Sequence, residues 1–180
     1  MKKSKIRKII LKKRELFHFK KKKIEFGNLL KLLNRKCENK KIGLYFPIGS
    51  EVSTIDLIEI LRKKKYIISL PVLNKNFDMS FYEWAKKGPL NINKYGIPEP
   101  LRLKKIIPST LIMPLVAFDI NLNRLGYGGG FYDRFINKSE KSKKILKIGL
   151  ALSCQKINKV PTDKFDKKMN YIFTENKIYK

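Results

Sequence analysis

Four short apolar runs constrain the fold of this chain more than any other feature. They cover residues 42–48, 66–73, 111–118 and 145–152, and polar or glycine- and proline-containing segments separate them. Each run has the length of a strand and is almost continuously apolar, which is typical of strands buried on both faces of a parallel sheet. None approaches the roughly 20 residues that span a bilayer. Helical patterns alternate with the runs, so we expect an α/β fold: one three-layer α/β/α domain with a mostly parallel sheet, over residues 1–180.

The remaining elements follow from periodicity and from local signals. Residues 1–34 carry apolar side chains at helical spacing and predict one long or two shorter amphipathic helices with basic outer faces. We expect this segment to pack on the domain, with a calmodulin-target or membrane-surface helix as the alternative. Ser53, with Asp56 three residues later, predicts a helix start with a weak capping box. Further strands are expected at 79–84 and 171–174, a helix from 131–137, and a loop-dominated segment with room for a short strand at 88–108.

The net charge of +27 raises the question of nucleic-acid binding. Only seven of the 42 basic residues are arginines, the residue type that reads base edges and clamps phosphates with two hydrogen bonds. Lysine is spread along the whole chain together with isoleucine and asparagine, and AT-rich codons specify all three. We therefore attribute most of the charge to codon bias, and keep a polyanion-binding module as an alternative function.

The cysteine and histidine content argues against several kinds of site. Cys37 and Cys154 have no CxxC context and no histidine nearby, which argues against a disulfide framework and a zinc site. His18 is the only histidine, which argues against a Ser-His-Asp triad. No apolar signal region follows the N-terminal Met-Lys-Lys, so we expect a cytoplasmic protein.

A glycine-rich stretch is the most informative part of the sequence for function. Gly126, Gly128, Gly129 and Gly130 fall between an expected buried strand and an expected helix. At the carboxyl edge of an α/β sheet, such a loop turns backbone N–H groups toward a phosphate, and the following helix N-terminus favours negative charge. The pattern is neither a P-loop, because no Lys-Ser/Thr follows, nor a G-x-G-x-x-G fingerprint. A tight structural turn is the alternative for the glycines alone.

The stretch as a whole resembles the 5-formyltetrahydrofolate cyclo-ligase family. That family's signature joins P-x-x-x-F-D to R-L-G-x-G-x-G-[YF]-Y-D, and the chain has PLVAFD at 114–119 and RLGYGGGFYD at 124–133. Further matches follow in order along nearly the full length: Lys3 and Arg7 in K-x-x-x-R, Glu51 after a strand, Met79, Phe81 and Trp84 in M-x-F-x-x-W, YGIPEP at 95–100, and IGLAL, Gln155, Val160, Pro161, Asp166 and YIFTE toward the end.

The resemblance implies a role for each matching residue. It implies an ATP site formed by Lys3, Arg7, Arg124, Leu125, Gly126, Tyr127, Gly128, Gly129, Gly130, Phe131 and Tyr132. It implies Mg²⁺ as cofactor, held by Asp133 and Asp166, and a folate site of Phe46, Glu51, Trp84, Tyr127 and Phe131. Arg124 and Tyr132 are the expected catalytic residues. The family most often has tyrosine at position 131, so substrate binding is expected to be weaker if that hydroxyl matters.

The reaction that the resemblance implies is the ATP-dependent closure of 5-formyltetrahydrofolate to 5,10-methenyltetrahydrofolate. The expected partners are therefore ATP and a folate, with no specific nucleic acid and no membrane, and the protein is expected to be a monomer or a weak homo-oligomer. The family's fold resembles the sugar-phosphate isomerase and CoA-transferase superfamily. An enzyme of that kind, without an ATP requirement, is a second alternative function.

Overall fold

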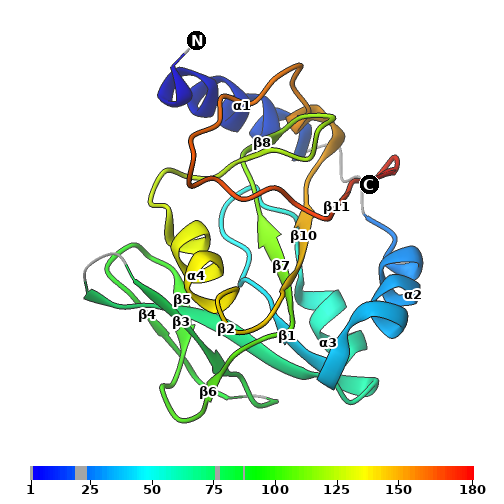
Figure 1. Ribbon diagram of the computed structural model, residues 1–180, viewed down its shortest axis with the longest axis vertical. Coiled ribbons are helices and arrows are strands. Elements are labelled where there is room, and N and C mark those ends of the chain that lie inside the picture. Colours follow the sequence, from blue (N-terminus) through cyan, green and yellow to red (C-terminus); the bar gives the residue numbers. More distant parts are fainter. Residues whose placement is uncertain (1, 19–23, 76–77, 87) are drawn as a thin grey trace.

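The central sheet matches the expectation of a mostly parallel α/β fold. The computed structural model describes residues 2–18, 24–75, 78–86 and 88–180, and within them eight strands follow the order β12-β11-β10-β7-β1-β2-β3-β6 (Figure 1). The strands are β1 (Lys41–Gly43), β2 (Ile67–Leu73), β3 (Met79–Glu83), β6 (Lys105–Ile106), β7 (Thr110–Pro114), β10 (Leu146–Leu150), β11 (Tyr171–Phe173) and β12 (Ile178–Tyr179). The five neighbours from β11 to β2 run parallel, and β12 and β3 flank them antiparallel.

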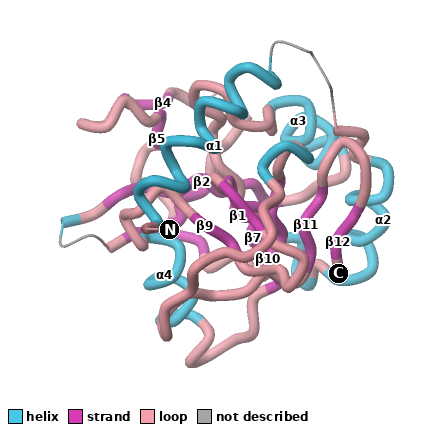
Figure 2. Tube along the Cα trace, turned by 90° about the horizontal axis from the view of Figure 1, so that it is seen from above, coloured by secondary structure: helices cyan, strands magenta, loops and turns pink. Residues whose placement is uncertain are grey.

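Helices cover both faces of this sheet. They are α1 (Lys3–His18), α2 (Gly27–Lys36), α3 (Ile55–Lys63) and α4 (Phe131–Ser139). Figure 2 shows α4 on one side of the strands and α2 with α3 on the other, which makes the three layers. The basic N-terminal segment forms two helices, and residues 19–23 between them lie outside the described part of the chain.

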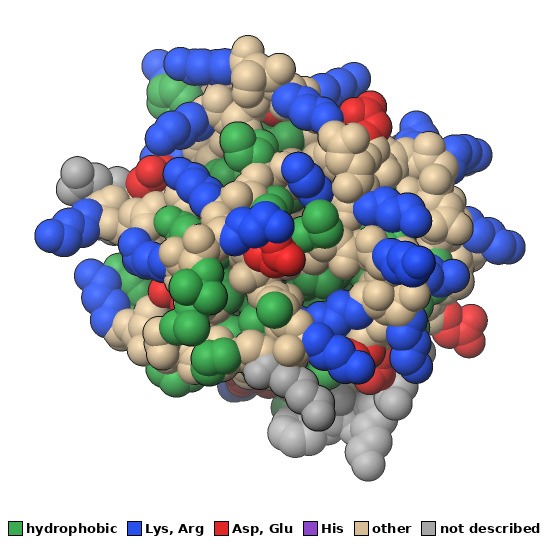
Figure 3. Space-filling model, turned by 90° about the horizontal axis from the view of Figure 1, so that it is seen from below, with side chains coloured by type: hydrophobic (Ala, Val, Ile, Leu, Met, Phe, Trp, Pro, Cys, Tyr) green, Lys and Arg blue, Asp and Glu red, His purple; other side chains and the backbone are tan. Residues whose placement is uncertain are grey.

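The surface and the helix lengths bear on the expected partners. Lysine and arginine side chains are scattered over the face in Figure 3, with hydrophobic side chains among them, and do not form a single stripe. Within the described residues, no helix has both the length and the apolar character needed to cross a membrane.

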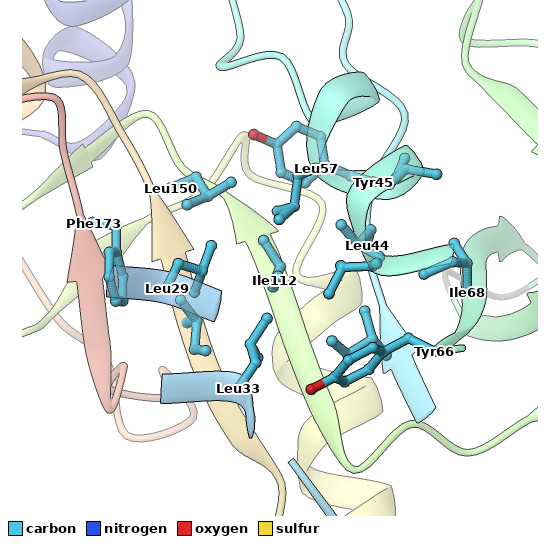
Figure 4. Packing of buried hydrophobic residues seen from close by; sticks show 14 of the residues in the cluster. Leu29, Leu33, Leu44, Tyr45, Leu57, Tyr66, Ile68, Ile112, Leu150 and Phe173 are labelled. Carbon is cyan, nitrogen blue, oxygen red and sulfur yellow. The ribbon is translucent and has the colours of Figure 1, made fainter. Parts of the chain in front are cut away.

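The main core lies between the sheet and the helices α2 and α3 (Figure 4). Leu33 of α2 and Leu57 of α3 are fully buried with Ile112 of β7. A second cluster places Phe135 and Ile136 of α4 on the opposite face. These clusters explain the near-continuous apolar runs, because the central strands are buried on both sides.

Helix α1 packs at the carboxyl end of the parallel strands. Ile6 and Ile10 contact a small cluster that includes Val116 and Leu125, beside the hairpin of β8 (Ala117–Phe118) and β9 (Arg124–Leu125). Lys3 and Arg7 lie on the same face of α1 as these two isoleucines, so the packing brings them to the edge of the sheet where ligands bind in α/β proteins.

Two of the expected strands are shorter than their apolar runs. The run 42–48 contributes only Ile42 and Gly43 to β1, and the chain then leaves the ladder toward the edge of the sheet. The expected strand 111–118 divides after Pro114, and the amide of Val116 instead donates to the carbonyl of Leu125 at 2.8 Å. Both predicted strands were therefore too long, because the apolar residues beyond the hydrogen-bonded ladder are also buried, in loops and in the hairpin.

The capping box predicted at Ser53 is wrong. Helix α3 begins at Ile55, its N-cap is Thr54, and no side chain caps it. The Thr54 side chain is fully buried, and its hydroxyl donates to the carbonyl of Tyr45 at 2.7 Å. That bond fixes the loop after β1 to the start of the helix, so the hydroxyl is unavailable as a cap.

The segment 88–108 contains more strand than expected. Strands β4 (Leu90–Ile92) and β5 (Pro98–Pro100) form an antiparallel hairpin, and β6 joins the edge of the main sheet. The carboxyl group of Glu99 anchors the hairpin by accepting the amide of Leu73 at 2.7 Å. The hairpin thereby forms a wall beside the end of β2.

Candidate active site

One cavity of about 780 Å³ lies at the carboxyl ends of β1, β2 and β7. Loops that follow parallel strands meet at this edge, where α/β proteins bind their ligands. The cavity brings together most of the predicted site residues, which are far apart in the sequence. Its lining includes Lys3, Arg7, Phe46, Glu51, Arg124, Leu125, Gly126, Tyr127, Gly128, Gly129, Gly130, Phe131, Tyr132, Asp133 and Asp166.

The glycine-rich loop forms one wall and is in contact with α1. Gly128 has a φ of 112° and Gly130 a φ of 65°, backbone conformations that favour glycine. The Nε of Arg7 donates to the carbonyl of Gly126 at 2.8 Å. Helix α4 follows directly, so its N-terminal amides and the Arg7 guanidinium both lie beside the loop. This end of the cavity is suited to a phosphate group.

Arg124 adds a buried positive charge to the same wall. Its side chain is 5% exposed, and one terminal nitrogen donates to Oδ1 of Asp133 at 2.8 Å. Its Nε has no hydrogen-bond partner among the described residues. A buried donor without a partner is costly, so Arg124 is suited to receive an additional acceptor such as a phosphate oxygen.

Lys3 and two carboxylates form a second charged group at the cavity. The Nζ of Lys3 lies 2.7 Å from Oδ2 of Asp163 and 2.7 Å from Oδ2 of Asp166. Burial by itself would raise the pKa of Asp166, but hydrogen bonds from Lys3 and from the Asp163 amide outweigh it, and the pKa lies below its ordinary value. Asp166 is therefore ionised at neutral pH.

The donor set can be tested for its fit to Mg²⁺. The described residues contain no cluster of three or more metal-ligating side chains. Mg²⁺ in nucleotide sites is usually held by one or two carboxylates together with substrate phosphates and water. Asp133 and Asp166 both line the cavity and both contact a cationic side chain. They fit a magnesium ion that is shared with a bound nucleotide.

The other end of the cavity combines a buried carboxylate with aromatic rings. Glu51 is 5% exposed, and it accepts hydrogen bonds from the Ile48 amide at 3.0 Å and from the Tyr127 hydroxyl. Burial raises the pKa of Glu51, and these hydrogen bonds oppose that effect. Phe46 lies on the same loop and lines the cavity. A carboxylate acceptor beside a flat apolar surface suits a planar heterocycle that carries N–H groups.

Trp84, which we expected in the folate site, is not among the residues that line this cavity. Its ring packs edge-on against Phe46 with the centroids 6.1 Å apart, and its Nε1 donates to the carbonyl of Gly88 at 2.9 Å. The guanidinium of Arg62 lies 4.3 Å from the Trp84 ring centroid. Trp84 therefore supports Phe46 from behind.

Several lining residues were given no role in the site by the sequence analysis, although some belong to the matched motifs. Tyr95, Ile97 and Glu99 alternate along the β4–β5 hairpin, and all three reach the cavity. Their period of two within YGIPEP was a signal for a shared face. Asp163 lies three residues before Asp166. The other lining residues that had no expected role are Tyr45, Ile48, Pro71, Leu73, Met79 and Pro114.

The fold and the cavity are those of an α/β protein whose candidate ligand site combines a basic, glycine-rich end with an aromatic, acidic end. The chain matches the model of the 5-formyltetrahydrofolate cyclo-ligase family over residues 1–175, and it belongs to this family.

Individual relatives agree with this assignment. The chain is 38% identical to the 5-formyltetrahydrofolate cyclo-ligase of Haemophilus influenzae over 135 residues, which are 71% of each chain. Its fold is similar to the NMR structure of Aquifex aeolicus 5,10-methenyltetrahydrofolate synthetase, with a TM-score of 0.78 and 30% identity over 99% of this chain and 92% of that one. A 5,10-methenyltetrahydrofolate synthetase from Mycoplasma pneumoniae gives a TM-score of 0.73 at 25% identity, covering 96% and 98% of the two chains.

Proposed function

We propose that this protein converts 5-formyltetrahydrofolate to 5,10-methenyltetrahydrofolate and turns ATP into ADP and phosphate. One observation carries the proposal beyond family membership: a single cavity has two chemically different ends. Arg7, Arg124 and the glycine-rich loop suit phosphates, and Phe46 with Glu51 suits a pterin ring. A cavity of about 780 Å³ lies within the range of pockets that hold small molecules and cofactors.

The chemistry explains why a nucleotide is needed. The N5-formyl group is an amide, so its carbon is a poor electrophile for the weakly nucleophilic N10. If N10 attacked directly, the formyl oxygen would have to leave as hydroxide. Transfer of the γ-phosphoryl group to that oxygen creates an electrophilic carbon and a good leaving group in one step.

The proposed reaction has two steps. The formyl oxygen attacks the γ-phosphorus, the bond from that phosphorus to the β,γ-bridging oxygen breaks, and ADP leaves. N10 then attacks the formyl carbon, the carbon–oxygen bond breaks, and inorganic phosphate leaves with the former formyl oxygen. The N10 proton is released, and the product is the methenyl cation. No water enters the balance.

The protein's part is to position both substrates and to stabilise charge. In the proposed complex, Lys3, Arg7 and Arg124 bind phosphate oxygens, and the Arg124 guanidinium offers a fixed fork to the transferring group. Burial raises the pKa of Tyr132, so its hydroxyl stays protonated and acts as a donor in the cavity. Asp133 and Asp166 would hold a Mg²⁺ ion, which would further neutralise the phosphate charge.

The proposal is tested by following the absorbance of the methenyl product with purified protein, 5-formyltetrahydrofolate and Mg-ATP. We expect product to form with both substrates present and none to form when ATP is omitted. Product formation without ATP, or its absence with both substrates, would contradict the proposal. A sugar-phosphate isomerase or CoA transferase would give no methenyl product in this assay.

A further inference from the structure

Arg14 of α1 is a buried arginine that the proposed reaction leaves without a role. Its side chain is 4% exposed. Its Nε donates to Oγ of Ser50 at 3.0 Å, and its Nη1 donates to the hydroxyl of Tyr127 at 2.8 Å. Both partners are neutral hydroxyl groups, although a buried charge is costly unless an opposite charge balances it.

The balancing charge is the Glu51 carboxylate, which is connected to Arg14 through one hydroxyl group. The Tyr127 hydroxyl accepts from Arg14 and donates to Oε1 of Glu51. Tyr127 is 44% exposed, but its hydroxyl oxygen lies between the Arg14 guanidinium and the Glu51 carboxylate. Burial and the Glu51 charge raise the pKa of Tyr127, so the hydroxyl keeps the proton that it donates. Arg14, Tyr127 and Glu51 therefore form one hydrogen-bonded chain from α1 to the cavity.

Arg14 also connects two separate walls of the cavity. Ser50 precedes Glu51 on the loop after β1, and Tyr127 lies on the glycine-rich loop. Arg14 is not among the residues that line the cavity, so it acts on a ligand through Ser50, Tyr127 and Glu51.

We propose that Arg14 is a positioning residue for the folate site: it holds the Tyr127 hydroxyl and the Glu51 carboxylate where they receive the N–H groups of the pterin ring. This inference rests on the proposed function. It adds a residue that follows Arg7 by two helical turns, so one face of α1 serves both ends of the cavity.

The charge of Arg14 has a second consequence, on the ionisation of Glu51. The titratable and charged groups that face Glu51 are Arg14 from α1, Tyr45 after β1, Tyr127 from the glycine-rich loop and Tyr132 from α4. Arg14 is the cation of this set. Burial raises the pKa of Glu51 and the Arg14 charge lowers it. Removal of the Arg14 charge therefore raises the pKa of Glu51 further, and Glu51 becomes protonated at a higher pH.

A first experiment tests this step without any substrate. The ¹³C carboxyl resonance of Glu51 is assigned by its loss in Glu51→Gln and titrated in the wild-type protein and in Arg14→Gln, Arg14→Lys and Lys13→Gln. Lys13 is the exposed neighbour on the same helix and controls for the loss of one charge. We expect an upward shift of the Glu51 pKa in Arg14→Gln, a smaller one in Arg14→Lys, and none in Lys13→Gln. An unchanged Glu51 pKa in Arg14→Gln would overturn the proposal.

A second experiment measures the consequence for turnover. In Arg14→Gln we expect the KM for 5-formyltetrahydrofolate to rise roughly tenfold, as loss of hydrogen bonds to a charged group implies, while the KM for ATP stays nearly constant. The acidic limb of kcat/KM for the folate should move to higher pH, and Arg14→Lys should restore part of both effects. Equal increases in both KM values would indicate a purely structural role and overturn the proposal.

Tyr127→Phe is a milder variant, because it leaves the buried Arg14 in place and is less disruptive to folding. Tyr127→Phe removes the bridging hydroxyl and leaves Arg14 in place, and it should likewise raise the folate KM and the Glu51 pKa. A Tyr127→Phe protein with the wild-type folate KM and Glu51 pKa would contradict the bridge. Failure of the proposed function would differ from all these results, because the wild-type protein itself would then form no methenyl product.

Discussion

At the scale of single residues, two cations at the basic end of the cavity are paired with the expected metal ligands. Arg124 contacts Asp133, and Lys3 contacts Asp166. In both contacts the opposite charges offset one another, which lowers the cost of burying them. Binding of Mg-ATP would exchange these partners, with phosphates on the cations and Mg²⁺ on the carboxylates. The ion pairs therefore keep the charged groups oriented at the cavity.

Asp133→Asn tests the metal assignment. The amide keeps the size of the side chain but loses its charge, so we expect turnover to fall by roughly a hundredfold, since a bound metal contributes several kcal/mol. Circular dichroism and thermal unfolding should show an intact fold. Asp163→Asn is the comparison, because Asp163 is 72% exposed and should have a smaller effect. Wild-type turnover in Asp133→Asn, together with indifference to EDTA, would rule out this role.

The local pattern of the chain could suggest site residues whose neighbours are near in sequence, whereas roles for Lys3 and Arg7, whose partners are distant, came from the family resemblance. Arg124 and Asp133 lie nine positions apart around a glycine-rich loop, so one motif contains both the loop and its charges. Arg14 was not predicted, because its partners Ser50 and Tyr127 are 36 and 113 residues away and belong to other elements. Within its helix it is one basic residue among many.

At the scale of elements, α1 determines how both ends of the cavity are assembled. Ile6 and Ile10 fix the helix against the small cluster at the β8–β9 hairpin. The same face of the helix carries Lys3 and Arg7, because residues 3, 6, 7 and 10 are related by spacings of three and four. Arg7 contacts the carbonyl of Gly126, and Lys3 contacts Asp166. The helix is thus part of the site as well as a cover for the sheet.

The double variant Lys3→Gln/Arg7→Gln tests that role. We expect the KM for ATP to rise roughly tenfold or more, as loss of charge-assisted hydrogen bonds implies, and the KM for folate to change much less. The double variant Lys5→Gln/Lys8→Gln removes the same charge from the exposed side of the helix and is the matched control. If both double variants change the two KM values alike, net charge alone explains the effect.

The boundaries of elements were harder to predict than their existence. The α/β alternation was confirmed because burial on both faces leaves a continuous apolar run in the sequence. The division between β7 and β8 could not be read from that pattern, since Leu115 and Val116 stay buried after the ladder ends. The start of α3 could not be read from the pattern either: the expected cap was Ser53, but the N-cap is Thr54, whose hydroxyl bonds to a carbonyl nine residues away.

At the scale of the whole molecule, the chain carries a net charge of +27, and we propose that its cavity binds anionic ligands. Lysine and arginine are dispersed over the face in Figure 3 without forming a continuous track. Such a field attracts any anion, including nucleotides and folates, and does so less as salt rises. It does not by itself indicate a nucleic-acid function.

Nucleic-acid binding should accordingly be weak and independent of sequence. We expect affinity for a short DNA duplex, measured by fluorescence anisotropy, to fall steeply between about 50 and 200 mM salt, as counterion release requires. A scrambled duplex of equal length serves as the control and should bind equally well. A tight complex that prefers one sequence and survives physiological salt would instead favour the polyanion-binding alternative.

The central claim is that the γ-phosphoryl group of ATP is transferred to the formyl oxygen. Turnover of 5-formyltetrahydrofolate that carries ¹⁸O in its formyl group tests this directly, with mass analysis of the inorganic phosphate. Unlabelled substrate in ¹⁸O-water is the control and should give unlabelled phosphate. The account predicts one ¹⁸O atom in phosphate for each methenyl product formed. Unlabelled phosphate, with the ¹⁸O recovered in water, would show that the formyl oxygen leaves as hydroxide and would contradict the account.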